Sequence, residues 1–178
     1  MLQKISIRKI AFAGVIAALY ATLTVALAPI AYGPFQFRIA EALCILPFFF
    51  PITVPGLFVG CLIANMLSPY GILDVVVGSA ASLLAALCTM LIGRLGREKL
   101  LMKVLACIPP VIINAVCIGA VIAYYMVSGG EVDTFFPAFV INGLQVGLGQ
   151  LVVLYTLGLS LLIYLPKTKA FNRVNDNR

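Results

Sequence analysis

Histidine and tryptophan are both missing from this chain of 178 residues. Without histidine the chain lacks the commonest general base and metal ligand, and the serine–histidine and cysteine–histidine pairs that activate many enzymatic nucleophiles. Without tryptophan it lacks the aromatic ring that binds cations best. It also has no Gly-x-x-x-x-Gly-Lys-Ser/Thr loop, with which many proteins bind and hydrolyse ATP. These gaps argue against an enzyme, and Glu41 and Asp74 are the only carboxylates placed to converge as an acid–base pair.

Charged residues are scarce as well: they make up 10% of the chain, against about 25% in soluble domains. Hydrophobic residues make up 63%, and the mean hydropathy is +1.14. This composition excludes a soluble domain and predicts an all-α integral membrane protein. The apolar run that starts at Ile10 is followed by further apolar stretches instead of a polar mature sequence. We therefore expect no cleavage of a signal peptide.

Five cysteines are scattered through the apolar segments without a close pair, at positions 44, 61, 88, 107 and 117. This spacing suggests neither a disulfide framework nor a metal cluster. We interpret these cysteines as small core residues, and we expect the protein to need no metal ion and no other cofactor.

The apolar runs predict six membrane-spanning helices in a single domain that covers residues 1–178. A spanning helix needs about 20 apolar residues, and four runs reach this length. The stretch from Ala40 to Leu67 is broken by three prolines, so we divide it into two shorter helices. The first of these is also short enough to be a re-entrant segment. The expected helices cover residues of about 10–30, 40–50, 53–67, 72–93, 104–127 and 135–165.

The basic residues predict how these helices are oriented, because cytoplasmic loops are rich in lysine and arginine. Eleven of the twelve basic residues fall on one side of the predicted topology, while the other side receives Arg38 and the acids Glu41, Asp74, Glu131 and Asp133. We therefore expect a multi-pass protein of the cell membrane with both termini in the cytoplasm. The net charge of +6 indicates orientation and contact with anionic lipid, and not nucleic-acid binding. The eleven residues are Lys4, Arg8, Lys9, Arg94, Arg97, Lys99, Lys103, Lys167, Lys169, Arg173 and Arg178.

Polar residues at the outer ends of the helices predict a binding site. Arg38 and Glu41 stand in sequence that otherwise suits lipid, where an unpaired charge is costly and by default indicates function. Amide side chains in the later helices lie deeper, so that the polar groups outline a cup that opens outward and suits a flat, nitrogen-rich molecule. The candidate residues are Gln36, Arg38, Glu41, Asn65, Asp74, Asn114, Asn142 and Gln145, with ring faces from Phe35, Phe37, Tyr32 or Tyr124.

Each candidate also has a structural interpretation. Arg38 and Glu41 are spaced i, i+3 and can neutralise each other at the start of a helix. Asp74 suits the N-terminal end of a helix dipole. The amides can hold neighbouring membrane helices together, and we assign Gln150, which lies deeper than the rest, to that role. The case for a site is therefore the convergence of these groups and not any one of them.

The first helix carries a flat stripe of small residues, Ala13, Ala17 and Ala21. Flat stripes allow membrane helices to approach closely. Internal packing is the default interpretation of this stripe, and an interface with a second membrane protein is the alternative.

Two runs of residues carry a more specific pattern. They are Gly-Pro-Phe-Gln-Phe-Arg-Ile-Ala-Glu-Ala-Leu at 33–43 and Gly-Cys-Leu-Ile-Ala-Asn-Met-Leu-Ser-Pro-Tyr-Gly-Ile-Leu-Asp at 60–74. In these runs the chain resembles the QueT family of substrate-binding components of energy-coupling-factor transporters, and the resemblance extends from about Ala11 to Leu162. Two positions depart from the family pattern: Ala40 stands where serine is expected, and Gln150 where glutamate is expected. These departures weaken a hydroxyl contact at position 40 and a deep carboxylate role at position 150.

The resemblance implies a six-helix bundle that captures a queuosine precursor, chiefly 7-aminomethyl-7-deazaguanine. It also implies delivery of the ligand by tilting in the bilayer, on a membrane scaffold protein with two ATPase subunits. Glu41 and Asp74 would then be the ligand's carboxylates, while Arg38 and Gln36 would close the outer loop or hold Glu41 in place. The remaining edges of the ligand would be read by Asn65, Asn114, Asn142 and Gln145.

Two other functions in transport stay open at this point. One is a substrate-binding component for another vitamin or base, because a pocket can change while its fold persists. The other is a self-sufficient carrier driven by a proton on Glu41 or Asp74. Such carriers usually contain internal repeats, and residues 1–90 and 91–178 show no convincing similarity.

Overall fold

Every element that the computed structural model describes is a helix. The structure describes residues 7–168 and 171. The elements are α1 (Ile7–Ala26), α2 (Ala28–Ala31), η1 (Ile39–Phe48), α3 (Thr53–Asn65), α4 (Gly71–Leu73), η2 (Asp74–Gly78), α5 (Ser79–Leu95), α6 (Leu100–Ala106), α7 (Ile108–Ser128), α8 (Phe135–Val153), η3 (Leu154–Gly158), α9 (Leu159–Tyr164) and η4 (Leu165–Lys167).

Four stretches of the described chain are helical, long enough and apolar enough to cross a membrane: Ile7–Ala26, Gly71–Leu95, Leu100–Ser128 and Phe135–Lys167. η1 and α3 are also apolar, but they have only 10 and 13 residues, fewer than the about 20 that a spanning α-helix needs. The prediction of an all-helical fold is confirmed for the described residues, with four helices long and apolar enough to span a membrane and two shorter ones.

Prolines explain where two of the long helices differ from the expected ranges. α1 ends at Ala26, and Pro29 stands in the first turn of the separate short helix α2. Toward the C-terminal half, α6 and α7 meet at Cys107, and Pro109 and Pro110 follow in the first turn of α7. A proline is tolerated there because its missing N–H would have no partner within the helix. Because prolines in the first turn of α7 do not end the helical stretch, α6 and α7 follow each other directly. The third long stretch starts with α6 at Leu100, four residues before the expected position 104.

The short helix η1 lies in the middle of the bundle. It is a 3₁₀ helix, which is uncommon at this length. Because a 3₁₀ helix rises about 2 Å per residue, its ten residues extend over about 20 Å. Eight of the ten residues are buried, so the helix is enclosed by protein instead of facing lipid. Its neighbours are α1, α5 and η3, and Tyr20, Ile45, Phe48 and Leu154 belong to the core that they share.

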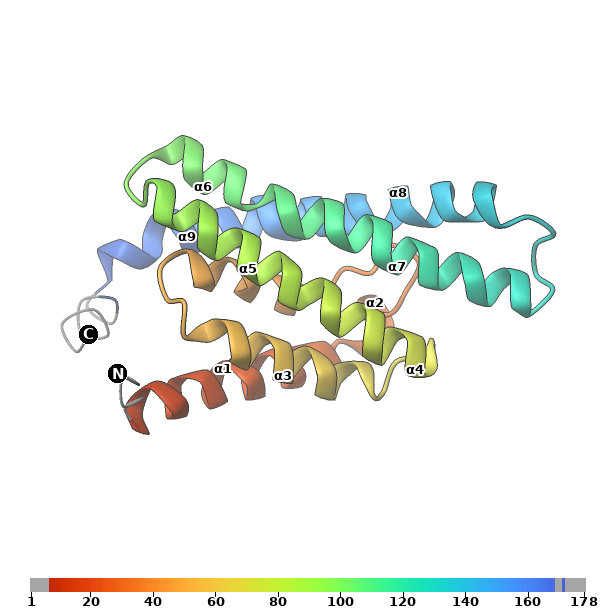
Figure 1. The fold of residues 1–178 in the computed structure, drawn as a ribbon, viewed down its shortest axis with the longest axis horizontal. Helices are drawn as coiled ribbons and strands as arrows, with labels where there is room; N and C mark the ends of the chain where they lie inside the picture. The colour runs from red at the N-terminus through yellow and green to blue at the C-terminus, as the bar shows by residue number, and fades with distance from the viewer. Residues whose placement is uncertain (1–6, 169–170, 172–178) are drawn as a thin grey trace, which may run out of the picture.

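Figure 1 shows a bundle of roughly aligned helices in which α5 crosses the middle, between α3 and α7. α1 lies along α3 on one side, and α8 lies along α7 on the other. The start of α1, the α5–α6 loop and η4 gather at one end. α2, α4 and the loop between α7 and α8 lie at the other, where the α7–α8 hairpin extends beyond its neighbours.

The described basic residues lie largely at the first of these two ends. Arg8 and Lys9 belong to the first turn of α1, Arg94 to the last turn of α5, and Lys167 to η4. Lys4, Lys169, Arg173 and Arg178, which we counted on the same side of the predicted topology, lie outside the described residues.

Large apolar side chains are exposed along the whole outer surface of the bundle. In a soluble protein so much exposed apolar surface would promote aggregation, whereas in a bilayer it faces lipid chains. Examples from four helices are Val15, Leu84, Ile112 and Leu144.

Candidate functional site

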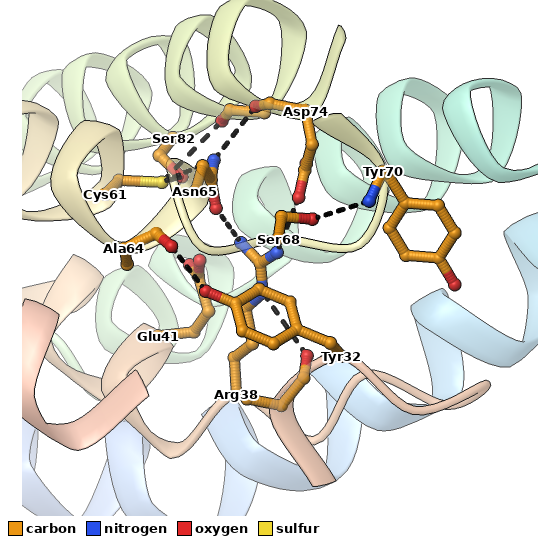
Figure 2. A network of polar contacts seen from close by, with 12 residues as sticks. Tyr32, Arg38, Glu41, Cys61, Ala64, Asn65, Ser68, Tyr70, Asp74 and Ser82 are labelled. Atoms are coloured by element: carbon orange, nitrogen blue, oxygen red, sulfur yellow. Dashed lines mark hydrogen bonds and ion pairs between the residues drawn. The ribbon is translucent and has the colours of Figure 1, made fainter. Parts of the chain in front are cut away.

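Arg38 lies at the centre of a buried polar network between the loop at 32–38, α3 and η2 (Figure 2). Its Nη2 pairs with Asp74 Oδ2 at 3.1 Å, and its Nη1 donates to Asn65 Oδ1 at 3.0 Å. Its Nε donates to the backbone carbonyl oxygen of Ala31 at 3.4 Å. The side chains of Arg38 and Asp74 are 3% and 0% exposed, so water does not screen the ion pair. We call Arg38, Asn65 and Asp74 the Arg38 network.

Asn65 joins Arg38 to η2, which is a π-helical turn. Its Nδ2 donates to the backbone oxygen of Asp74 at 3.0 Å and to Cys61 Sγ at 3.4 Å. Gly78 permits this close approach, because a Cβ there would lie 2.5 Å from Asp74 Oδ1 and 2.7 Å from Asn65 Nδ2. The wide turn and the glycine together hold the Asp74 carboxylate against Arg38.

Tyr32 covers the Arg38 network from the side of the loop (Figure 2). The Arg38 Cζ atom lies 5.0 Å from the centre of the Tyr32 ring, within the range of a cation–π interaction. The Tyr32 hydroxyl donates to the backbone oxygen of Ala64 at 2.6 Å, which ties the loop to α3. The guanidinium therefore has partners around its edge and above its face.

Glu41 forms a second buried cluster, separate from Asp74. Its carboxylate accepts hydrogen bonds from the Tyr20 hydroxyl and from the Cys44 thiol. The i, i+3 pairing of Arg38 with Glu41, which the sequence left open as a structural interpretation, is wrong, since the ion pair of Arg38 is with Asp74. The reason is local: Arg38 precedes η1 in an extended conformation, so helical spacing does not relate it to Glu41.

The loop before Arg38 divides its side chains between the interior and the surface. Gln36 is buried and has a left-handed backbone (φ 46°). Phe35 is 42% exposed and stacks on Phe37, with ring centroids 5.9 Å apart. The loop backbone packs tightly on α8, because a Cβ at Gly149 would lie 1.8 Å from the Phe35 carbonyl oxygen.

A cavity of about 650 Å³ opens at the end of the bundle where α7 and α8 project. We call it the end cavity. Aromatic, amide and hydroxyl groups line it beside apolar side chains, and one carboxylate stands among them. The lining residues are Pro34, Pro69, Tyr70, Ile122, Tyr125, Met126, Glu131, Val132, Thr134, Pro137, Ala138, Ile141, Asn142 and Gln145.

Tyr70 and Tyr125 provide the aromatic surface of the end cavity. Their ring centroids lie 6.1 Å apart with the planes at 51°. Gly71, with φ +54°, makes room for this pair, since a Cβ there would lie 3.1 Å from the Tyr125 hydroxyl. Burial raises the pKa of the Tyr70 phenol, and the negative charges of Asp74 and Glu131 add to the rise. The phenol is therefore protonated at neutral pH and available as a hydrogen-bond donor.

Of the eight polar and four aromatic site residues that the sequence predicts, two, Asn142 and Gln145, lie on the wall of the end cavity. Asn142 Nδ2 donates to the backbone oxygen of Ala138 at 2.8 Å and to Met126 Sδ at 3.2 Å, which fixes its amide in place. The others do not line the cavity. They are Arg38, Asn65 and Asp74 in the Arg38 network with Tyr32 over it, Glu41 in its own cluster, Gln36 and Asn114 in the interior, Phe37 partly buried, and Phe35 and Tyr124 at the surface.

The sequence interpretation missed Tyr70, Tyr125 and Glu131 as cavity residues. Tyr70 follows Ser68-Pro69, a turn signal inside the run at 60–74, and Glu131 follows Gly129-Gly130 in the loop between two helices. Polar and aromatic residues beside such turns are candidates for binding, because loops carry binding residues more often than helix interiors do. Tyr125 has no such signal. It is adjacent to Tyr124 in α7, and only the register of that helix decides which of the two tyrosines faces the cavity.

The alanine stripe of α1 packs inside the protein. A Cβ at Gly56 of α3 would lie 2.3 Å from the backbone oxygen of Ala13, and a Cβ at Gly60 would lie 2.7 Å from that of Ala17. Ala17 is buried, and Ala13 and Ala21 are partly buried. α3 therefore covers Ala13 and Ala17. The exposed alanines and glycine of α1 are Ala11, Gly14, Ala18 and Ala26.

No group of three or more histidine, cysteine, aspartate or glutamate side chains gathers in the part of the chain that the structure describes. Its free cysteines are Cys44, Cys61 and Cys107, which are buried, and Cys88 and Cys117, which are partly exposed.

Comparison with known proteins assigns the chain to a family. The QueT transporter family matches residues 10–167, which is most of the chain. The chain belongs to the QueT transporter family. It is also 41% identical over 71 residues to the queuosine precursor transporter QueT of Lactococcus lactis subsp. cremoris. That alignment covers 39% of this chain and 41% of the relative, and no solved structure matches the chain.

Membership in the QueT transporter family confirms the resemblance found in the two sequence runs. It assigns the chain to a family of transporters. The apolar helices agree with a multi-pass membrane protein.

Proposed function

We propose that this QueT family protein is the substrate-binding component of an energy-coupling-factor importer for a queuosine precursor, and that the end cavity is its binding site. The family match supports transport, and the name of the Lactococcus relative, a queuosine precursor transporter, supports the ligand class. The main support for this binding site is the volume of the cavity, about 650 Å³, since small-molecule sites have volumes of about 300–1,000 Å³.

The chemistry of the cavity wall suits 7-aminomethyl-7-deazaguanine, which has a flat base with both donors and acceptors on its edge. Tyr70 and Tyr125 offer ring faces against which such a base can stack. Gln145 offers an amide that can donate and accept, whereas Asn142 offers its Oδ1 as an acceptor, because its Nδ2 already donates to Ala138 and Met126. The Arg38 network and the Glu41 cluster hold the elements around the cavity and do not contact the ligand in this proposal.

In the proposed topology six segments cross or enter the membrane, and both termini lie in the cytoplasm. The basic residues at the end of the bundle that holds the start of α1 and η4 support this orientation. The end cavity then faces outward. Delivery occurs by tilting on a membrane scaffold protein with two ATPase subunits, which meets α1 on the exposed face of Ala11, Gly14 and Ala18 instead of the covered alanines.

The test is calorimetric titration of the purified solitary protein with 7-aminomethyl-7-deazaguanine, its 7-cyano analogue, guanine and an unrelated vitamin. We expect binding of at least one deazaguanine and no binding of the vitamin. Binding of the vitamin in place of the deazaguanines would assign the protein another ligand. Absence of binding across the panel, by protein shown to be folded, would contradict the proposal.

A second experiment separates this importer from a self-sufficient proton-coupled carrier. The tagged protein is purified from a membrane that contains energy-coupling-factor subunits, and the bound proteins are identified. We expect the scaffold and both ATPase subunits to co-purify. Uptake of the ligand by liposomes that contain only this chain, driven by a proton gradient, would favour the carrier instead.

A further inference from the structure

Glu131 is the one formally charged residue among the described residues that line the end cavity. The other polar groups of its wall, on Tyr70, Tyr125, Thr134, Asn142 and Gln145, are neutral side chains at neutral pH. The charge of Glu131 is therefore the only full charge that the wall presents to a ligand.

The end of α7 fixes the position of Glu131. The backbone N–H of Glu131 donates to the carbonyl oxygen of Met126 at 2.9 Å, and that of Gly129 donates to Tyr125 at 2.8 Å. Gly130 between them has φ +72°, the left-handed conformation that closes many helix C-termini. Glu131 thus leaves the helix in a defined direction, next to Tyr125 and Met126, which line the cavity from the last turns of α7.

The surroundings leave the charge of Glu131 available to a ligand. Glu131 is exposed at the cavity. The only salt bridge found among the described residues joins Arg38 to Asp74, so the arginine at this end of the bundle is already neutralised. Asp133, two residues further along the same loop, is exposed and does not line the cavity. The wall is therefore negative, with aromatic rings beside the charge.

We propose that Glu131 binds a positively charged group of the ligand, and that it makes the end cavity select an ammonium-bearing base over a neutral base of the same shape. The inference rests on the proposed function, because it takes the end cavity as the substrate site. In this inference the ammonium binds Glu131, which lies outside the two sequence runs at 33–43 and 60–74. Glu41 and Asp74, the carboxylates of those runs, are both buried among protein partners. The tyrosine rings support the same cation through their faces.

The test compares wild-type protein with Glu131→Gln by calorimetric titration, using 7-aminomethyl-7-deazaguanine and its neutral 7-cyano analogue. Glu131→Gln keeps the size of the side chain and removes its charge. We expect affinity for the aminomethyl compound to fall about fivefold to tenfold, and affinity for the cyano compound to change less than about twofold. Asp133→Asn is the matched control, since it removes a charge from the same loop outside the cavity, and it should leave both affinities unchanged.

The outcomes separate this inference from the proposed function. Wild-type protein that binds neither compound contradicts the proposed function itself. Wild-type protein that binds the aminomethyl compound, with an unchanged affinity in Glu131→Gln, leaves the function standing and overturns the role of Glu131. An equal loss for both compounds in Glu131→Gln also overturns it, because selection by charge requires a difference between them. Raising the salt concentration should weaken the wild-type preference and not that of the variant.

Discussion

The Arg38 network and the end cavity are two polar regions of one apolar bundle, and they differ in what their polar atoms meet. In the network, Arg38 contacts Asp74, Asn65, a backbone carbonyl and the face of Tyr32. In the end cavity, amides, phenols and one carboxylate face a space of about 650 Å³. The first region pairs Arg38 with Asp74 inside the protein, although Asp74 Oδ1 has no hydrogen-bond partner among the described residues. The second region leaves its carboxylate facing open space.

The difference shows what a charge in apolar sequence indicates. A buried charge in a membrane protein needs a partner, and that partner can be a ligand or another residue of the chain. Arg38 and Asp74 are partners of each other, although 36 positions separate them in the sequence. Their presence in a motif therefore indicates a requirement of the fold at least as much as contact with substrate.

The largest effect is expected for Asp74→Ala, which removes the partner of Arg38 and tests whether the Arg38 network is closed to water. We expect the free energy of unfolding to fall by about 3–5 kcal/mol, because an unpaired buried charge remains. The double variant Arg38→Met with Asp74→Leu should recover most of this loss, since it removes both charges and keeps apolar volume. The measurement is denaturant unfolding in detergent.

Asp133→Ala serves as the control for Asp74→Ala, because Asp133 is exposed. Its effect on the free energy of unfolding should stay within about 0.5 kcal/mol. A loss below about 1 kcal/mol in Asp74→Ala would mean that the Arg38 charge reaches water, and the Arg38 network would then belong with the cavity instead of the core.

Much of the fold could be predicted from the sequence because lipid imposes strong rules on it. Long apolar runs must be helical in a bilayer, and those runs gave the four full-length helices. Pro47, Pro51 and Pro55 indicated that the helix after Ala40 would be short. The 3₁₀ geometry of η1 and the π-helical turn at Asp74 could not be predicted, because they depend on how the neighbouring helices pack around them.

The candidate site was harder to predict than the fold, since a polar side chain looks the same in sequence whether its partner is a residue or a ligand. Asn142 and Gln145 were chosen by depth, and they line the end cavity. Asn65 was chosen because it lies at the outer end of its predicted helix, yet it bonds Arg38 and Asp74. What separates these amides is the position of α3 and α8 relative to the cavity, which only tertiary structure provides.

Two glutamines on α8 test where the binding site ends and the protein interior begins. Gln145 lines the end cavity, whereas Gln150 is buried, with its Oε1 lacking a hydrogen-bond partner among the described residues. We expect Gln145→Leu to weaken binding of 7-aminomethyl-7-deazaguanine about fivefold, equivalent to about 1 kcal/mol, because one hydrogen bond to the ligand is lost.

Gln150→Leu makes the same chemical change away from the end cavity, and it should leave that affinity within about twofold of wild type. Both variants are measured by calorimetry, after their thermal unfolding has been compared with that of wild type. Equal losses of affinity in the two variants would place the ligand deeper than the end cavity.

The smallest expected effect is at Asn114, and it tests how far the site extends along α7. Asn114 is buried, and its Nδ2 has no hydrogen-bond partner among the described residues. Replacing such a group by an apolar one of similar size is often nearly neutral, so Asn114→Leu should change the free energy of unfolding by less than about 1 kcal/mol and ligand affinity by less than about twofold. Asn142→Leu, the matched change on the cavity wall, should weaken binding about fivefold. If Asn114→Leu weakens binding as much as Asn142→Leu does, the ligand reaches the interior of the bundle, and the distinction between a closed network and an open cavity fails at this residue.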